Sequence, residues 1–378
     1  MNNYISTTED LNNLVKFLSK EKFLSLDTEF IREGYYYPKL CLLQISSLKD
    51  SFIIDPLSEK IDLSSFWKII YNDKITIVMH SCRQDLEIFH NINGELPKNI
   101  FDTQIAAMVC GYGDQVGYDK LVKSLFNLNI DKSSRTSDWS IRPLNNKQRL
   151  YAIDDVKFLA KIYPILKNEL FKNKRSKWIE DEFSKLFVKE NYILKPDLAW
   201  QRINIKTSNR EVINRIKFLA GWREDYAQKN NLPRNYILKD DLIIEIAYQC
   251  PSSSQDFLKI RGFHKNKVKF ISDILLFLSK ANSEPKENWP SNPNKKKSKS
   301  YPIIIELLKI LLKYKSETFG VAQKLIASTN DLENLSIGKN NNLNCLKGWR
   351  FEIFGKDALE VCSGKKAIKI ENNKLIIF

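Results

Sequence analysis

The chain has 378 residues, of which 43% are hydrophobic, and this is longer than one hydrophobic core usually serves, so we predict two or three domains. Its formal charge of +15 is uneven. Residues 1–170 carry 21 Lys or Arg against 22 Asp or Glu, whereas residues 171–378 carry 39 against 23, which favours a polyanionic partner over mere compositional bias. Six scattered cysteines without a CxxC pair, and no apolar run of roughly 18–20 residues, exclude a disulfide framework and a membrane span, so we expect a cytoplasmic protein.

The first 170 residues predict a mixed sheet covered by helices. Short β-rich runs bounded by polar residues are KFLSLDTEF, KLCLLQIS, SFIIDP and ITIVMHS. Between and after them, SSFWKIIYN, QDLEIFHNI and TQIAAMVCG repeat their apolar residues at helical spacing. A long helix is expected to begin with Asn145 or Asn146 as its N-cap and to run through QRLYAIDDVKFLAKIYPIL.

The remaining residues predict two helical modules. No strand-like run occurs between about Ser208 and Asn282, and YPIIIELLKILLKY restarts a helix after a stretch rich in Pro, Ser, Asn and Lys. The later segment LKGWRFEIFG loosely echoes LKIRGFHKNKVKF, which suggests related modules. We therefore expect a catalytic domain, a connecting segment, a helical domain, a basic linker and a second helical domain at 1–170, 171–207, 208–285, 286–300 and 301–378.

Two carboxylates, Asp27 and Glu29, stand two residues apart at the end of the first predicted strand. Side chains at i and i+2 project from the same face of a strand, so these two converge. Asp85 follows ITIVMH in the opening turn of a helix, and such a strand-to-helix junction faces the functional edge of a sheet. Taken singly, the pair could be an exposed strand end, and Asp85 a helix-start carboxylate favoured by the helix dipole.

Tyr151 and Asp155 stand four residues apart in the long predicted helix, so the phenol and the carboxylate share one helical face. A partly buried Tyr beside a surface Asp is the alternative. Four convergent carboxylates without a basic partner repel one another, and two divalent cations would balance their charge. Oxygen-only ligands select Mg²⁺ or Mn²⁺ over zinc, and two such ions can drive hydrolysis of a phosphodiester. The residues thus predict a metal-dependent phosphodiesterase.

Three segments, LDTEF, HSCRQDLEIF and YAIDDVKFL, resemble the exonuclease motifs of the DEDD superfamily in their usual order. The flanking LDTEFIREGYYYPKLCLLQIS, GELPKNIFDTQIAA and DWSIRPLNNKQRLYAIDDVKFL are similar to the ribonuclease D family. The stretches RIKFLAGWRE and LPRNYIL resemble that family's HRDC nucleic-acid-binding domain, and the third unit resembles its second HRDC-like module. This resemblance spans nearly the whole chain. It implies an α/β ribonuclease H-like catalytic domain with a mixed sheet, followed by two small all-α HRDC-like domains.

The resemblance also implies roles for the matched positions. Asp27 would bridge two metal ions, and Glu29 and Asp155 would complete the site of the ion that activates water. Asp85 would hold the second ion, mainly through coordinated water. The family divides according to whether a Tyr or a His orients the attacking water, and Tyr151 makes this chain the Tyr type.

Further residues near the motifs are candidate substrate contacts, each with an ordinary structural role as the alternative: Gln44, Asp102, Gln104 and Arg142.

By resemblance, the expected activity is that of a 3′-to-5′ exoribonuclease releasing 5′-monophosphates. Its substrates would be tRNA precursors and other small structured RNAs with a single-stranded 3′ end, and the basic C-terminal half would hold their phosphates. No obligate protein partner is expected. Nothing in the residues separates RNA from DNA, so a DNA-directed 3′-to-5′ repair or proofreading exonuclease is one alternative. A catalytically silent nucleic-acid-binding scaffold is the other, although all five chemical positions are filled.

Overall fold

The computed structural model describes residues 3–292, 301–372 and 374–378, and these form two compact units. The second unit comprises Phe30–Lys39 and the described residues from Lys189 to 292. The first unit comprises the other described residues, including the C-terminal segment. Each unit has its own hydrophobic core.

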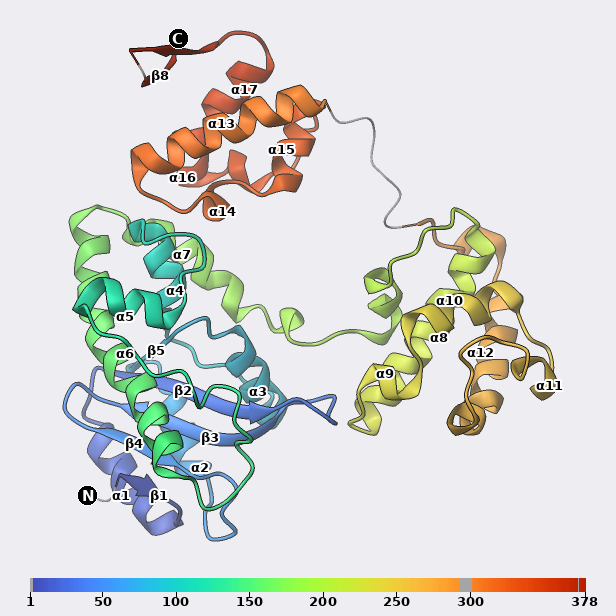
Figure 1. The fold of residues 1–378 in the computed structure, drawn as a ribbon, viewed down its shortest axis with the longest axis horizontal. Coiled ribbons are helices and arrows are strands. Elements are labelled where there is room, and N and C mark those ends of the chain that lie inside the picture. The colour runs from blue at the N-terminus through green and yellow to red at the C-terminus, as the bar shows by residue number, and fades with distance from the viewer. Residues whose placement is uncertain (1–2, 293–300, 373) are drawn as a thin grey trace. The chain divides into compact units, whose positions relative to one another are not determined.

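A six-stranded mixed sheet forms the centre of the described part of the first unit, in the order β1-β4-β3-β2-β5-β6 (Figure 1). Its strands are β1 (Tyr4–Ile5), β2 (Phe23–Ile31), β3 (Lys39–Ser46), β4 (Ser51–Ile54), β5 (Thr76–Met79) and β6 (Ile100–Asp102). The pairs β1–β4, β2–β5 and β5–β6 are parallel, and β3–β4 is antiparallel. The predicted mixed sheet is confirmed. Strands β1 and β6 had no sequence signal because two or three residues are too few to show an alternating pattern.

Helices pack on this sheet: α1 (Thr8–Leu18), α2 (Ser64–Ile70), α3 (Arg83–Asn93), α4 (Thr103–Cys110), α5 (Tyr118–Phe126), α6 (Asn146–Lys172) and α7 (Ser176–Ser184). The long helix α6 begins where the sequence predicts. The Asn145 side chain accepts a hydrogen bond from the Gln148 backbone N–H at 2.9 Å, and the Gln148 side chain accepts one from the Asn145 N–H at 3.0 Å. Leu159 and Leu166 on its apolar face are buried in the core with Val78 of β5.

The C-terminal segment forms a third module that belongs to the first unit. Its elements are α13 (Pro302–Phe319), α14 (Gln323–Ile326), α15 (Thr329–Ser336), α16 (Gly348–Arg350), α17 (Lys356–Cys362) and the antiparallel hairpin of β7 (Ile368–Glu371) with β8 (Lys374–Ile377). The prediction of a wholly helical domain at 301–378 missed this hairpin. Its signal was the alternation of apolar and polar residues in AIKIE, which a short strand reproduces.

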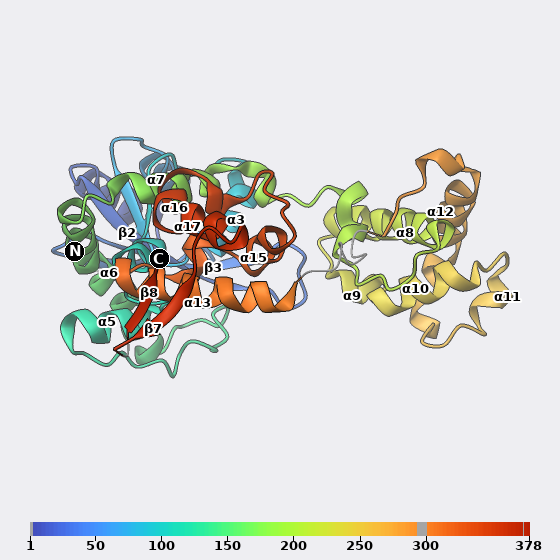
Figure 2. The same cartoon turned by 90° about the horizontal axis from the view of Figure 1, so that it is seen from above.

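This C-terminal module, whose hairpin of β7 and β8 is labelled in Figure 2, docks on α4 and α7 (Figure 1). The Trp178 ring of α7 stacks on the Trp349 ring of α16, with centroids 4.5 Å apart and planes inclined by 8°. The Ala322 backbone N–H donates to the Met108 carbonyl at 2.9 Å. Helix α7 thus packs as part of this unit, although we expected its residues to lie in a connecting segment at 171–207.

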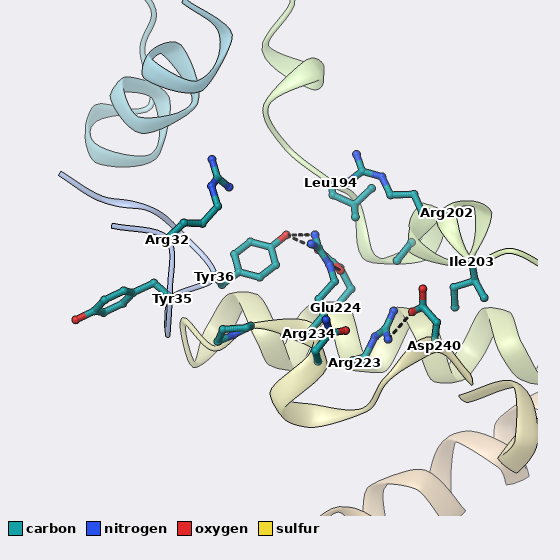
Figure 3. A pocket seen from close by; sticks show the side chains of 13 residues that line it. Arg32, Tyr35, Tyr36, Leu194, Arg202, Ile203, Arg223, Glu224, Arg234 and Asp240 are labelled. Atoms are coloured by element: carbon teal, nitrogen blue, oxygen red, sulfur yellow. Dashed lines mark hydrogen bonds and ion pairs between the residues drawn. The ribbon is translucent and has the colours of Figure 1, made fainter. Parts of the chain in front are cut away.

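The second unit includes the residues between β2 and β3, which lie against its helices (Figure 3). The Tyr37 backbone N–H donates to the Asn231 side chain at 2.8 Å, and the Tyr36 phenol donates to the Glu224 carboxylate. Motif residues Asp27 and Glu29 therefore lead directly into a chain segment that packs in the other unit.

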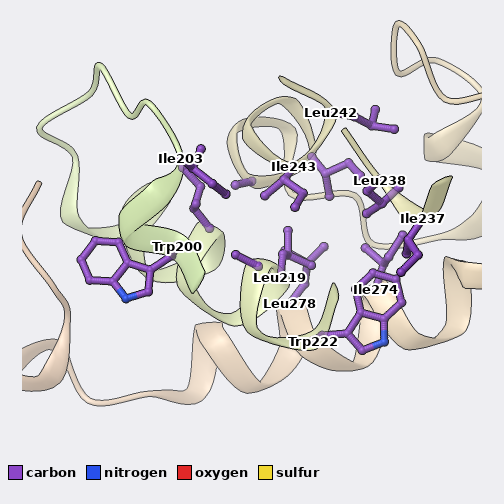
Figure 4. Close-up of a cluster of buried hydrophobic side chains, with 14 of the residues drawn as sticks. Trp200, Ile203, Leu219, Trp222, Ile237, Leu238, Leu242, Ile243, Ile274 and Leu278 are labelled. Carbon is purple, nitrogen blue, oxygen red and sulfur yellow. The ribbon is translucent and has the colours of Figure 1, made fainter. Parts of the chain in front are cut away.

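Helices make up the rest of the second unit: α8 (Arg210–Lys229), α9 (Arg234–Ile237), α10 (Asp240–Gln249), α11 (Ser254–Phe257) and α12 (Ile271–Ser283). Their core contains Leu219, Trp222 and Ile274, and Trp200 from the 3-10 helix Pro196–Arg202 joins it (Figure 4). The order of a long, a four-residue and a medium helix recurs in α13, α14 and α15, which supports related modules. Most of the basic linker expected at 286–300 lies outside the described residues. Within the part of the chain that the structure describes, no helix combines the length and the apolarity needed to span a membrane.

Docking of the C-terminal module brings two backbone turns into close approach. Gly111 ends α4 with φ +89°, and a Cβ there would lie 2.8 Å from the Gly320 carbonyl oxygen. We expect Gly111→Ala to destabilise the protein by more than the roughly 1–2 kcal/mol of a left-handed alanine alone, as measured by thermal unfolding. The matched control is Gly94→Ala at the end of α3, where φ is +68° and no described atom lies within 4 Å of the new Cβ. Equal destabilisation in the two variants would contradict the close approach.

Candidate active site

Strand β2 and helix α6 bring three carboxylates together. Oxygens of Asp27, Glu29 and Asp155 all lie within 4.8 Å of one another. A hydrogen bond beneath them explains the approach, because the Ser25 hydroxyl of β2 donates to the Val156 carbonyl of α6 at 2.8 Å. Ser25, Asp27 and Glu29 alternate along β2 and share one face, so the strand presents both acids to the helix.

Asp85 stands beside this group. It is buried in the first turn of α3, and its carboxylate accepts a hydrogen bond from the Thr28 hydroxyl. Burial is the largest cause that raises the pKa of Glu29 and of Asp85, and charge adds to it: Asp85 raises the pKa of Glu29, and Asp27 raises the pKa of Asp85. The predicted four carboxylates therefore form one electrostatic cluster. Thr28 was not among the predicted site residues, although it lies between the two acids of the first motif.

Tyr151 is half-buried one turn before Asp155 and hydrogen bonds to that carboxylate. Burial, followed by the charges of Asp155 and Glu29, raises the pKa of the Tyr151 phenol. The Trp139 ring packs against Tyr151 with centroids 5.9 Å apart, and Trp139 is 2% exposed. Tyr151 is thus kept as a neutral phenol. The sequence did not predict a role for Trp139, because a contact between a loop and a helix produces no periodic pattern of residues.

The cluster holds more negative charge than its surroundings balance. Burial is the main cause that raises the pKa of Glu29 to about 10 and of Asp155 to about 7, and it also raises the pKa of Asp27 and Asp85 well above the usual range. Arg135 lowers the pKa of Glu29 and Asp155 without offsetting burial. Carboxylates in this state either share protons or bind cations. The oxygen-only set of donors fits a hard divalent cation.

The predicted substrate contacts Asp102 and Gln104 have partners within the protein. Asp102 caps α4 by accepting from the backbone N–H groups of Gln104 and Ile105, and it also accepts from the N–H groups of Ser81 and Cys82 before α3. The Gln104 side chain donates to the Val116 carbonyl at 3.2 Å. These contacts support the structural alternative for both residues, because Asp102 fixes the turn that leads to the helix of Asp85.

Arg142 is also occupied. Its Nε and Nη2 donate to the two carboxylate oxygens of Asp55 at 2.7 Å, and the remaining donors reach the carbonyls of Trp139, Ile141 and Cys41. All five guanidinium N–H groups therefore have protein acceptors, and none is left for a phosphate. Arg142 therefore has a structural role, and the prediction that it contacts the substrate is not supported. It holds the loop that carries Trp139.

Gln44 differs from these residues. Its side chain is fully buried in β3, and neither its amide nitrogen nor its oxygen has a hydrogen-bond partner among the described residues. Buried amides are normally satisfied, so a missing polar partner at this position is expected from water or a ligand.

Comparisons with known proteins agree with this fold. One family model, described as 3′-5′ exonuclease, matches residues 2–171, and another, described as HRDC domain, matches residues 213–277. Ribonuclease D of Bartonella henselae is 39% identical over 377 residues, covering 98% of this chain and 92% of that protein. Ribonuclease D of Jannaschia sp. is 38% identical over 380 residues, covering 99% and 98% respectively.

A solved structure extends the agreement to three dimensions. The crystal structure of Escherichia coli RNase D, described as an exoribonuclease involved in structured RNA processing, matches with a TM-score of 0.83 at 28% identity. The match covers 97% of this chain and 99% of that one. The ribonuclease H-like α/β domain and the HRDC domain expected from the sequence are confirmed. With relatives that share well over a third of their residues along nearly its whole length, the chain belongs to the ribonuclease D family of 3′-to-5′ exoribonucleases.

Proposed function

We propose that the carboxylate cluster of β2, α3 and α6 is the catalytic centre, and that it removes nucleotides one at a time from the 3′ end of RNA as 5′-monophosphates. The observation that carries this proposal is the approach of three carboxylates within 4.8 Å of one another without a cation that offsets their burial. Asp85 adds a fourth negative charge. Such a group of buried acids costs free energy in the folded protein, and arrangements of this kind are typical of functional sites.

In this proposal, Asp27, Glu29, Asp85 and Asp155 hold two divalent cations, Mg²⁺ or Mn²⁺. When bound, such cations activate a water molecule and stabilise the leaving oxygen of a phosphodiester. Tyr151 orients the attacking water through its hydroxyl. Because its pKa is raised above that of an ordinary phenol, Tyr151 stays protonated and acts by hydrogen bonding, not as a base.

The proposed substrates are tRNA precursors and other small structured RNAs with a single-stranded 3′ end. The names of the relatives support RNA, and the description of the Escherichia coli enzyme supports structured RNA. The excess of Lys and Arg after residue 170 would neutralise phosphates of the RNA body. Six free cysteines support a reducing compartment, and we place the protein in the cytoplasm. Gln44 stays a proposed substrate contact from the sequence, although its amide is fully buried and lacks a partner among the described residues.

The first test removes one carboxylate. Asp27→Asn keeps the size of the side chain but weakens cation binding, so we expect activity to fall by more than the roughly 10–100-fold that changes outside the ligand shell cause. The assay follows 3′-extended tRNA with Mg²⁺ or with chelator, and sizes the products over time. Asp154→Asn is the control, since Asp154 is adjacent but points about 100° away around α6. A ladder that persists in Asp27→Asn, or random internal cuts by wild type, would falsify the proposal.

Tyr151→Phe tests the orientation of water. Loss of the hydroxyl should lower kcat by about a hundredfold or more, in the range of a positioned proton-handling group, while KM for RNA changes little. Single-turnover kinetics measure the chemical step. Tyr163→Phe, on the same helix and buried in the core, serves as the control. Equal rates for Tyr151→Phe and wild type would remove Tyr151 from the mechanism.

The raised carboxyl pKa values also predict how Mg²⁺ binding depends on pH. In the folded, metal-free protein the pKa is about 7 for Asp155 and about 10 for Glu29, against ordinary carboxyl pKa values of about 4. Between these pH values the folded protein therefore binds more protons than the unfolded chain. Its stability therefore falls as pH rises through this window. Cations must displace these protons, so we expect the rise in Tm caused by Mg²⁺ to grow from pH 6 to pH 8. Thermal unfolding with Mg²⁺ and with chelator measures it. In Asp27→Asn, the rise in Tm caused by Mg²⁺ should depend less on pH. If this rise were independent of pH in the wild type, the prediction would be contradicted.

A further inference from the structure

A pocket of about 390 Å³ opens in the second unit, between the residues that follow β2, the 3-10 helix Pro196–Arg202 and helices α8, α9 and α10 (Figure 3). Its charged lining consists of four arginines and two acids, Arg32, Arg202, Arg223, Arg234, Glu224 and Asp240. The lining therefore carries an excess of two positive charges. This excess is concentrated in one concave site, which distinguishes it from the lysines scattered over the surface.

Two of the arginines are held by ion pairs. Arg234 donates from Nη2 to Glu224 at 2.7 Å and to the Tyr36 hydroxyl at 2.9 Å, and its Nε also reaches Glu224. Glu224 is fully buried; burial raises its pKa, but hydrogen bonds from Arg234 and Tyr36 outweigh it and lower the pKa below the usual value. Glu224 is thus ionised and balances Arg234. This fixed pair forms part of the wall of the pocket.

Arg223 also lines the pocket and is held by acceptors of the protein itself. It is 3% exposed, and its Nη1 pairs with Asp240 at 2.7 Å and donates to the Leu238 carbonyl at 2.8 Å. Its Nε is buried and has no hydrogen-bond partner among the described residues. Arg223 and Arg234 therefore shape the wall of the pocket, whereas Arg32 and Arg202 are its exposed cations.

We propose that this pocket binds a phosphate group of the RNA backbone. The inference rests on the proposed function for the identity of the polyanion, but its geometry stands apart from the carboxylate cluster. Arg32 and Arg202 are exposed at the pocket and supply forked donors suited to phosphate oxygens. Tyr35 lines the same pocket, is 37% exposed, and carries an aromatic ring on which a base can stack.

The test compares two pairs of exposed residues in the second unit. Arg32→Ala with Arg202→Ala removes the two exposed arginines of the pocket, and Lys259→Ala with Arg261→Ala removes two exposed charges outside the pocket. Fluorescence anisotropy of 3′-extended RNA in chelator measures Kd without cleavage. We expect Kd of the pocket variant to rise roughly tenfold per arginine, and the salt slope of binding to shrink by about one for each phosphate that the variant no longer neutralises. Equal Kd and slope in the two double variants would overturn the proposal.

Two further measurements separate the possible outcomes. Titration with a nucleoside 5′-monophosphate tests free nucleotide as the source of the phosphate. If the pocket variant loses this binding but keeps its affinity for RNA, the assignment to RNA is overturned. In steady-state cleavage, the pocket variant should show a raised KM and an unchanged kcat, whereas a lowered kcat with unchanged Kd also overturns the proposal. Absence of cleavage by wild type would refute the proposed function, while the anisotropy comparison would still decide the pocket.

Discussion

Repulsion among the acidic side chains is the constraint on which the catalytic unit depends. Carboxylates of Asp27, Glu29 and Asp155 approach within 4.8 Å although burial and mutual charge disfavour their ionised forms. The surrounding fold must therefore supply the free energy that holds them together. It does so through the apolar face of α6 and through the hydrogen bond from Ser25 to the Val156 carbonyl, which fixes helix to strand beside the site.

The loop before α6 adds a second layer of support. Arg142 joins Asp55, which follows β4, to the carbonyl of Trp139, and the Tyr4 hydroxyl completes the set by donating to Asp55. Burial opposes the ionisation of Asp55, but the hydrogen bonds from Arg142 and Tyr4 lower its pKa. Trp139 is thereby held against Tyr151. Three parts of the chain thus fix the ring whose hydroxyl would orient water.

Site residues could be predicted from the sequence where two of them lie on the same face of one strand or one helix. Asp27 with Glu29, and Tyr151 with Asp155, follow the strand and helix periods, so each pair could be read from its own segment. The structural role of Arg142 could not, because its main partner lies 87 residues away in the chain and leaves no periodic signal. The docking of the C-terminal module was missed for the same reason, since amphipathic helices of isolated and docked modules look alike in sequence.

A buried glutamate elsewhere in the chain shows what the catalytic cluster lacks. Glu224 is fully buried, yet hydrogen bonds from Arg234 and Tyr36 overcome burial and lower its pKa. Burial also raises the pKa of Glu29, but there the charges of Asp27 and Asp155 raise it further, to about 10, and Arg135 does not offset them. The same side chain therefore takes opposite protonation states according to the cation beside it. At Glu224 the chain provides that cation itself, whereas at Glu29 it leaves a deficit of positive charge that divalent cations are suited to fill.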